Sequence, residues 1–301
     1  MFIFGVAAGL GTALSWAMSA IIHTNIARNV GVHSFMMLRQ PLALLVLVVP
    51  CLLTGQFQFY PIPTLLLGLF SGVIGIVLCD WCFYKAALLV GVRTAMACES
   101  LYACFTALLG MIFLEEHLGL QGLLGIVTAT LGVILVITQE HKNAPEVNTT
   151  NKQRLLGLVL AILAAFLMAL SLVLSRFVIL QGMPPLMLTF MRNAAAALVL
   201  WGMGIGLHKV GSTLLAARKM PHILRLLLIG CLLGTTGGTW LAMVALEYAP
   251  TAIAATFIGM QPIFLFIITG IIEKRCPAPG AIAGVCIACL GAAIVLLRNG
   301  I

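Results

Sequence analysis

The feature that most constrains the fold of this sequence is a series of ten apolar runs separated by short polar segments. A helix needs about 20 consecutive apolar residues to cross the hydrocarbon core of a bilayer, and each run meets that length. Most connections are very short, which favours hairpins of neighbouring helices. The sequence therefore predicts an all-α membrane protein with ten transmembrane helices, near residues 2–26, 34–54, 62–84, 93–114, 119–138, 155–177, 184–207, 222–247, 251–272 and 279–297.

The charge content supports a lipid environment. Hydrophobic residues make up 62% of the chain and charged residues only 8%, whereas a soluble globular protein carries about 25% charged residues. The net charge is +8, but the basic residues stand singly between apolar runs and form no basic stripe interleaved with aromatics, as nucleic-acid-binding proteins have. We therefore expect the lipid bilayer, and not nucleic acid, as a partner.

The chain also matches itself. A shift of 273 − 115 = 158 residues aligns Glu115 with Glu273 and Gly72 with Gly230, and a shift of 153 aligns Arg39 with Arg192. The sequence thus predicts a first repeat over residues 1–138, a polar linker over 139–154 and a second repeat over 155–301, each repeat with five helices. Because five is odd, the second repeat is expected to lie upside down relative to the first.

Lysine and arginine placement predicts the orientation, since these residues collect in cytoplasmic loops. The face that holds the first residue has only Arg176 and Arg298. The opposite face is therefore predicted to be cytoplasmic and both termini outside. That face holds Arg28, Lys85, Arg93, Lys142, Lys152, Arg154, Lys209, Arg218, Lys219, Arg225, Lys274 and Arg275.

Two stretches carry a family resemblance: TALLGMIFLEEHLGLQGLLGIVTATLGVILV and FLFIITGIIEKRCPAPGAIAGVCIACLGAAIVLL. Each is an apolar run, an acid, a short corner and a Gly-rich helix. Together with Arg39 and Arg192 and the Gly-rich third helix of each half, they resemble the ten-helix transporters with paired EamA domains in the drug/metabolite transporter superfamily. The resemblance implies a secondary transporter that exports or exchanges amino acids, metabolites or drugs across a bacterial inner membrane. Members usually have cytoplasmic termini, opposite to the prediction from charge.

Few ionisable residues lie inside the predicted helices, where each charge costs roughly 2.5–3.5 kcal/mol. His23, Arg39, Asp80 and Glu99 all sit at about the same depth, roughly 8–10 Å below the cytoplasmic face at 1.5 Å per residue. We expect Arg39 to pair with Asp80 or Glu99 around one wet pocket. Two interpretations stay open: a structural ion pair, or a pair that leaves one acid, Asp80 or Glu99, to bind a proton and couple transport to the proton gradient.

Polar stripes flank this cluster. Helical spacing puts the members of each stripe on one face, and such faces are expected to point into a cavity between the two halves, with Thr189, Arg192 and Asn193 as a second polar patch near the opposite membrane face. Aromatic side chains would line this cavity and suit an amphipathic or aromatic solute. The predicted solute-binding residues are Trp16, Ser19, His23, Arg39, Asp80, Trp81, Tyr84, Glu99, Tyr102, Ser171, Ser175, Arg192 and Trp240.

Other features are predicted to be structural. Glu115 and Glu273 are expected to accept hydrogen bonds from the backbone N–H groups of the corners that follow them. The cysteine pairs Cys79/Cys82 and Cys286/Cys289 lie in apolar runs, where cysteine packs as a small hydrophobe, so no metal site is predicted.

No nucleotide-binding loop and no catalytic motif occurs, so we expect neither a cofactor nor an enzyme. A flippase for lipids or lipid-linked precursors stays an alternative function, and an intramembrane enzyme a weaker one. Two fused repeats make a monomer sufficient, and a homodimer is possible.

Overall fold

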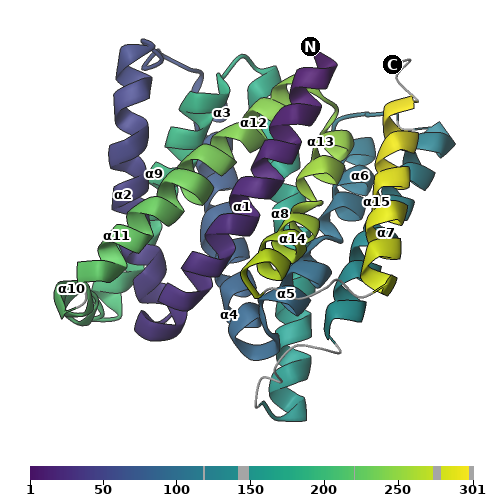
Figure 1. Ribbon diagram of the computed structural model, residues 1–301. Helices are drawn as coiled ribbons and strands as arrows, with labels where there is room; N and C mark the ends of the chain where they lie inside the picture. Colours follow the sequence, from purple (N-terminus) through teal and green to yellow (C-terminus); the bar gives the residue numbers. More distant parts are fainter. Residues whose placement is uncertain (118, 142–148, 220, 274–278, 298–301) are drawn as a thin grey trace.

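The computed structural model describes residues 1–117, 119–141, 149–219, 221–273 and 279–297. Over this part of the chain all regular structure is helical, and the long helices run side by side in one bundle (Figure 1). The elements are α1 (Phe2–Val30), α2 (Val32–Leu53), α3 (Ile62–Gly72), η1 (Val73–Cys79), α4 (Asp80–Val90), α5 (Val92–Glu99), α6 (Tyr102–Phe113), α7 (Gly119–His141), α8 (Asn151–Leu180), α9 (Pro185–Gly206), α10 (Val210–Lys219), α11 (Pro221–Gly230), η2 (Cys231–Gly238), α12 (Thr239–Tyr248), α13 (Thr251–Ile258), α14 (Gln261–Glu273) and α15 (Pro279–Leu297).

Eight helical stretches are long and apolar enough to cross a membrane. They correspond to α1, α2, α3–η1–α4, α5–α6, α8, α9, α11–η2–α12 and α13–α14. The helices α7 and α15 are apolar over shorter described segments, Gly119–Leu135 and Ile282–Val295. The chain is thus a multi-pass membrane protein, and eight of the ten predicted spans meet the length criterion.

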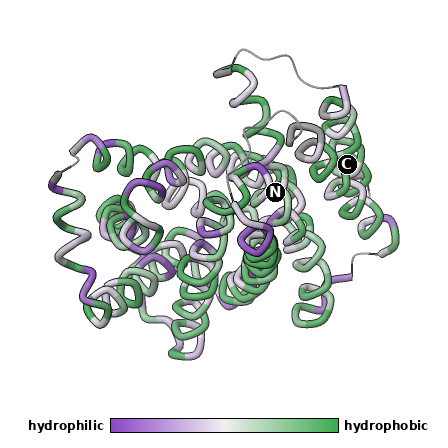
Figure 2. The backbone as a smooth tube through the Cα atoms, turned by 90° about the horizontal axis from the view of Figure 1, so that it is seen from below, coloured by the Kyte–Doolittle hydropathy of each residue, from purple (hydrophilic) through white to green (hydrophobic). Residues whose placement is uncertain are grey.

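Large apolar side chains are exposed along the outside of the bundle. Ile112, Leu120 and Leu198 each expose more than two thirds of their surface, and most of the tube in Figure 2 has hydrophobic colours. Water would penalise so much exposed apolar surface, since soluble monomers rarely expose large contiguous apolar patches. The hydrocarbon core of a bilayer is the environment that fits this surface.

The two halves interleave, each helix packing against an element of the other half. Helix α1 packs on η2 and α12, and its counterpart α8 packs on η1 and α4. Likewise α2 contacts α9, and α7 contacts α15. In Figure 1, α1 starts at the upper end and runs downward, while α8 starts at the lower end and runs upward. The centre of the bundle is therefore built from both halves.

Glycines allow both tight connections between helices and close packing of two helices. Gly31 joins α1 to α2 and Gly91 joins α4 to α5 as single connecting residues, with φ of 84° and 85°, a conformation that glycine adopts without steric cost. In the α7–α15 pair, a Cβ on Gly132 or Gly291 would overlap the backbone of Ala288 or Ala129 on the partner helix. These two helices consequently touch backbone to backbone.

Three expectations about the membrane edges need correction or fall outside the described residues. Helix α10 occupies the loop between the seventh and eighth predicted spans, where no helix was expected. The capping carboxylate is Glu116, not Glu115: Glu116 Oε1 accepts from Thr251 N at 2.8 Å and Thr251 Oγ1 at 2.7 Å, at the start of α13, while Glu115 points outward. The Glu273 side chain lies outside the described residues, as do Lys142, Lys274, Arg275 and Arg298.

Candidate functional site

A cavity of about 70 Å³ lies at the centre of the bundle. Its walls come from both halves of the chain, as the interleaved packing requires. The residues that line it are Trp16, Ser19, Ala20, His23, Arg39, Gly75, Ile76, Asp80, Phe83, Tyr84, Met96, Glu99, Met168, Leu172, Arg192, Gly234, Thr235, Thr239, Met243 and Gln261.

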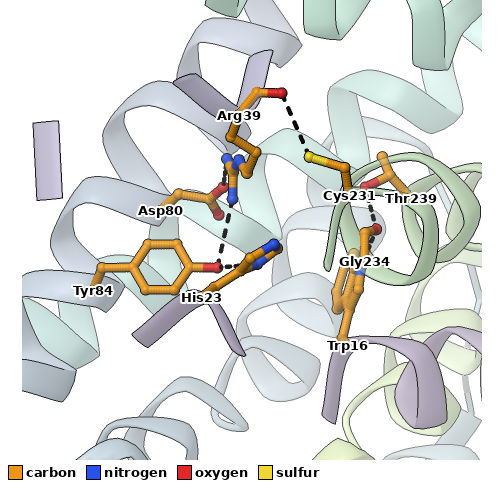
Figure 3. A network of polar contacts seen from close by, with 8 residues as sticks. All are labelled: Trp16, His23, Arg39, Asp80, Tyr84, Cys231, Gly234 and Thr239. Atoms are coloured by element: carbon orange, nitrogen blue, oxygen red, sulfur yellow. Dashed lines mark hydrogen bonds and ion pairs between the residues drawn. The ribbon is translucent and has the colours of Figure 1, made fainter. Parts of the chain in front are cut away.

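Two π-helical segments contribute to the walls of this cavity. The segments η1 and η2 start at Val73 and Cys231, which are 231 − 73 = 158 residues apart, the shift that relates the repeats. A π segment leaves backbone carbonyls without their usual α-helical partners, and such segments occur often at functional sites. The carbonyl of Gly234 accepts from the backbone N–H of Thr239, and also from Trp16 Nε1 at 3.3 Å and Thr239 Oγ1 at 3.4 Å (Figure 3).

Two helix breaks lie next to each other in the bundle. The chain breaks between α5 and α6 at residues 100–101, and between α13 and α14 at residues 259–260. Both breaks tighten to hydrogen bonds between residues three apart, Leu101 N to Cys98 O at 3.3 Å and Met260 N to Phe257 O at 3.2 Å. Pro262 contributes to the second break because proline has no N–H to continue the helix. Each break places a polar side chain at the cavity.

Arg39 is the centre of one polar network. Its Nη2 lies 2.5 Å from Asp80 Oδ2, and its Nη1 donates to Tyr84 Oη at 3.4 Å. Tyr84 Oη in turn lies 3.1 Å from His23 Nδ1, so three helices of the first half converge in Figure 3. The Arg39 guanidinium also lies 5.2 Å from the centre of the Phe35 ring. The predicted pairing of Arg39 with an acid is confirmed, and the acid is Asp80.

Glu99 lies apart from that ion pair. It is the last residue of α5 and is 5% exposed. Its Oε2 accepts a hydrogen bond from Gln261 Nε2 at 3.1 Å, and Gln261 is the first residue of α14. This bond joins the helix break of the first half to the helix break of the second. Among the described residues, Glu99 has no cationic side chain within ion-pair distance.

Arg192 is the second buried arginine of the cavity and is 3% exposed. Its Nη1 donates to Ser71 Oγ at 3.1 Å, to Ser171 Oγ at 3.0 Å and to Ser175 Oγ. The structure thus brings Arg192 into the same cavity as Arg39. Its neighbours Thr189 and Asn193 bond to backbone carbonyls of their own helix.

The structure separates the predicted site residues into three groups. The cavity-lining group is Trp16, Ser19, His23, Arg39, Asp80, Tyr84, Glu99 and Arg192. Ser171 and Ser175 stand behind Arg192 and hold its guanidinium. Tyr102, Trp81 and Trp240 are not cavity-lining residues: Tyr102 is fully buried, while Trp81 and Trp240 are about 40% exposed on the outside. Successive residues of a helix point about 100° apart. Asp80 and Thr239 face the cavity, and the residues that follow them, Trp81 and Trp240, therefore turn outward.

Several lining residues were not anticipated from the sequence. Gln261, Thr235 and Thr239 reach the cavity from the second half, and Gly75 and Gly234 form its glycine walls. A signal existed for Gln261, because an uncharged amide inside an apolar run also needs a polar partner in lipid. The described residues contain no group of three or more His, Cys, Asp or Glu side chains that would hold a metal ion.

Comparison with known protein families identifies the family of this chain. The sequence model of the EamA-like transporter family matches residues 3–138 and 155–297. The chain belongs to the EamA-like transporter family. The match covers both repeats, so the family, within the drug/metabolite transporter superfamily, spans nearly the whole sequence. This EamA-like chain is therefore a membrane transporter of small solutes.

A solved structure shows the same fold. A crystal structure of another protein superimposes on this EamA-like chain with a TM-score of 0.73 at 17% sequence identity. The superposition covers 98% of this chain and 96% of the other. No curated protein sequence matches the chain.

Proposed function

We propose that this chain is a secondary transporter that exports or exchanges small metabolites, amino acids or drugs, and that the central cavity is its solute site. One observation carries the proposal: a cavity lined by both halves contains five His, Arg, Asp or Glu side chains, one each from α1, α2, α4, α5 and α9. Polar and ionisable residues within membrane spans mark substrate and ion pathways. The lining residues thus fit a solute that crosses between the two halves.

The mechanism we propose is alternating access by inverted repeats. Transporter folds of this kind bind solute near the middle of the membrane, at the interface of two inverted repeats and at discontinuous helices. The opposite directions of α1 and α8 (Figure 1) and the paired helix breaks at residues 100–101 and 259–260 support this proposal. We infer that α7 and α15 also cross the membrane, which completes ten spans.

We further propose that Glu99 couples transport to protons. Asp80 is held by Arg39, which leaves Glu99 as the cavity carboxylate with only an amide partner. Gln261 donates to Glu99 Oε2, and that oxygen accepts equally well when the other oxygen carries a proton. The contact between the two helix breaks therefore survives both protonation states, while the charge of the cavity changes by one.

The flippase alternative predicts that the central cavity binds a lipid. The five His, Arg, Asp and Glu side chains at the cavity favour a polar or charged solute over the acyl chains of a lipid. An intramembrane enzyme has no specific observation in its favour.

Reconstitution tests the proposed function. The purified full chain is screened with small solutes by thermal shift, and each stabilising solute is then followed in proteoliposomes by counterflow and by uptake driven by a pH gradient. We expect saturable counterflow of at least one solute. Rapid movement of fluorescent lipids between leaflets, with no solute counterflow, would establish the flippase instead.

The proposed location is the inner membrane of a bacterium, with both termini outside as the lysine and arginine placement predicts. A reporter enzyme active only outside the cytoplasm, fused after Ile301, is expected to be active. An inactive reporter together with an active cytoplasmic reporter at the same position would reverse the orientation and leave the transport proposal intact.

A further inference from the structure

The two cavity arginines differ in how their charge is balanced. Arg39 has Asp80 at 2.5 Å. Arg192 has no carboxylate within 4.0 Å among the described residues, although it is only 3% exposed. A buried cation without a partner is costly in a medium of low dielectric constant. A membrane protein that keeps one at its solute cavity leaves a place for a negative charge from outside the chain.

The surroundings of Arg192 orient its guanidinium without neutralising it. Each serine that accepts from Nη1 gives its own proton to a backbone carbonyl: Ser71 to Gly68 at 2.7 Å, Ser171 to Ser71 at 2.9 Å and Ser175 to Ser171 at 2.7 Å. Only their lone pairs therefore face the arginine. These neutral acceptors fix Nη1 at the back of the cavity, while Nε has no hydrogen-bond partner among the described residues.

Gly75 of η1 makes room for the other edge of the guanidinium. A Cβ at this position would stand 2.7 Å from Arg192 Nη2 and 3.0 Å from Ser171 Cβ, closer than real side chains approach. The π segment thus brings a bare backbone against Nη2. Gly75 and Arg192 both line the cavity, so this edge is adjacent to the space that a solute occupies.

The charge and the space together define the ligand. With Arg39 neutralised by Asp80 and Glu99 protonated, Arg192 supplies one excess positive charge, which a single negative charge balances. A dianion would leave one negative charge in this cavity without a cationic partner. The flat guanidinium fork matches a carboxylate, and Met168, Leu172 and Met243 offer apolar surface nearby.

We propose that Arg192 is the binding point for the carboxylate of the transported solute, a small monocarboxylate with an apolar group; this inference rests on the proposed transport function. Ser71, Ser171 and Ser175 are positioning residues that hold the arginine. The Glu99–Gln261 bond lies at another wall of the same cavity.

Matched pairs of solutes test the proposal. The purified full chain is incubated with small monocarboxylates and with their primary amides, such as isovalerate with isovaleramide and benzoate with benzamide, and binding is measured by thermal shift and equilibrium titration. We expect at least one carboxylate to bind and its amide to bind about 10- to 100-fold more weakly, the effect of losing a charged hydrogen-bond pair. Inorganic phosphate at alkaline pH, where it is mainly a dianion, serves as the dianion arm and is expected not to bind.

Arginine variants assign the effect to one side chain. Arg192→Gln is expected to remove the preference for carboxylate over amide, and Arg192→Lys to retain the preference with weaker binding, because lysine keeps the charge and loses the fork. The matched control is Arg225→Gln, which removes an exposed arginine. This variant is expected to bind the carboxylate and its amide with the same affinities as the unsubstituted protein. If Arg192→Gln does not fold, Arg192→Lys and Gly75→Ala decide the question.

Different results would overturn the carboxylate site and the transport function. If every carboxylate binds no better than its amide, or if Arg192→Gln keeps the preference, the carboxylate site is wrong; counterflow of a neutral or cationic solute would then show that the transport proposal stands. Binding of phosphate alone would also overturn the monocarboxylate. Lipid movement without counterflow of any solute would overturn both.

Discussion

Arg39 in the first half and Arg192 in the second occupy equivalent positions but have different partners. Arg39 meets the acid Asp80 at 2.5 Å. The position equivalent to Asp80 in the second half is 80 + 158 = 238, and Gly238 stands there. Arg192 instead meets three serine hydroxyls. The repeat thus preserved the cation in both halves and the acid in only one.

This difference shows how a duplicated scaffold becomes an asymmetric site. The shared features are backbone features: the π segments, the helix breaks and the interleaved packing recur in both halves. The acids do not recur, since Asp80 and Glu99 both belong to the first half and align with Gly238 and Phe257. A symmetric frame permits two related conformations, and asymmetric charges allow one solute to be held in a defined orientation.

The largest expected effect comes from breaking the Arg39–Asp80 pair. Asp80→Asn leaves a buried arginine without its counter-charge, which costs about 3–5 kcal/mol for a buried pair. Arg192→Gln leaves no such charge, so we expect a loss of no more than about 1 kcal/mol. Unfolding of both variants in mild detergent measures the contrast. The double variant Arg39→Gln/Asp80→Asn is expected to recover most of the loss, and equal losses for Asp80→Asn and Arg192→Gln would contradict the comparison.

The two glycine walls offer the next test. Gly75→Ala and Gly234→Ala each place a Cβ against a serine of the opposite half, with Cβ–Cβ distances of 3.0 Å to Ser171 and 2.6 Å to Ser19. We expect each to destabilise the fold by about 1–3 kcal/mol, the usual cost of overpacking. Only Gly75→Ala also crowds Arg192, so only it should weaken carboxylate binding. Equal losses of carboxylate binding in the two variants would show that crowding of Arg192 does not cause the loss.

Glu99 tests the asymmetry of the acids. In Glu99→Gln the side-chain oxygen still accepts from Gln261, so the fold is expected to persist while the proton is no longer bound. We predict that uptake driven by a pH gradient falls at least about tenfold, equivalent to about 1.4 kcal/mol, and that solute counterflow continues. Glu99→Gln protein that keeps gradient-driven uptake would remove Glu99 from the coupling mechanism.

The smallest expected effect concerns the membrane edge. Glu116 accepts from the backbone N–H and the hydroxyl of Thr251 and thus caps α13 from the other half. Glu116→Ala is expected to lower stability by about 1 kcal/mol, typical for loss of a helix N-cap. Glu115→Ala is the matched control and is expected to change the melting temperature little. A larger loss for Glu115→Ala would restore the assignment made from the sequence.

Much of the frame was predictable because lipid restricts what a sequence can do. Runs of about 20 apolar residues define spans, and the shift of 158 residues relates the halves. Depth counting also predicted that Arg39 meets an acid of the first half, since equal depth on neighbouring helices brings long side chains together. These predictions depend on distance along helix axes, which sequence spacing gives directly.

Other parts of the site depend on rotation about helix axes, which spacing does not give. Neither the π segments nor the break after Glu99 has a clear sequence signal, because no proline lies near residues 100–101. Trp81 and Trp240 were therefore assigned to the cavity although their side chains turn outward. The bond between Glu99 and Gln261 joins residues 162 positions apart, and only the packed halves reveal it.

The central claim is that both halves build one solute cavity, and labelling of paired cysteines tests it most directly. Met96 lines the cavity from the first half and Met243 from the second. Each is changed to cysteine in a chain without its nine native cysteines and is labelled in vesicles with a membrane-impermeant maleimide from either side. The account predicts that the same transported solute protects both cysteines equally. Protection of one cysteine and not the other would contradict it.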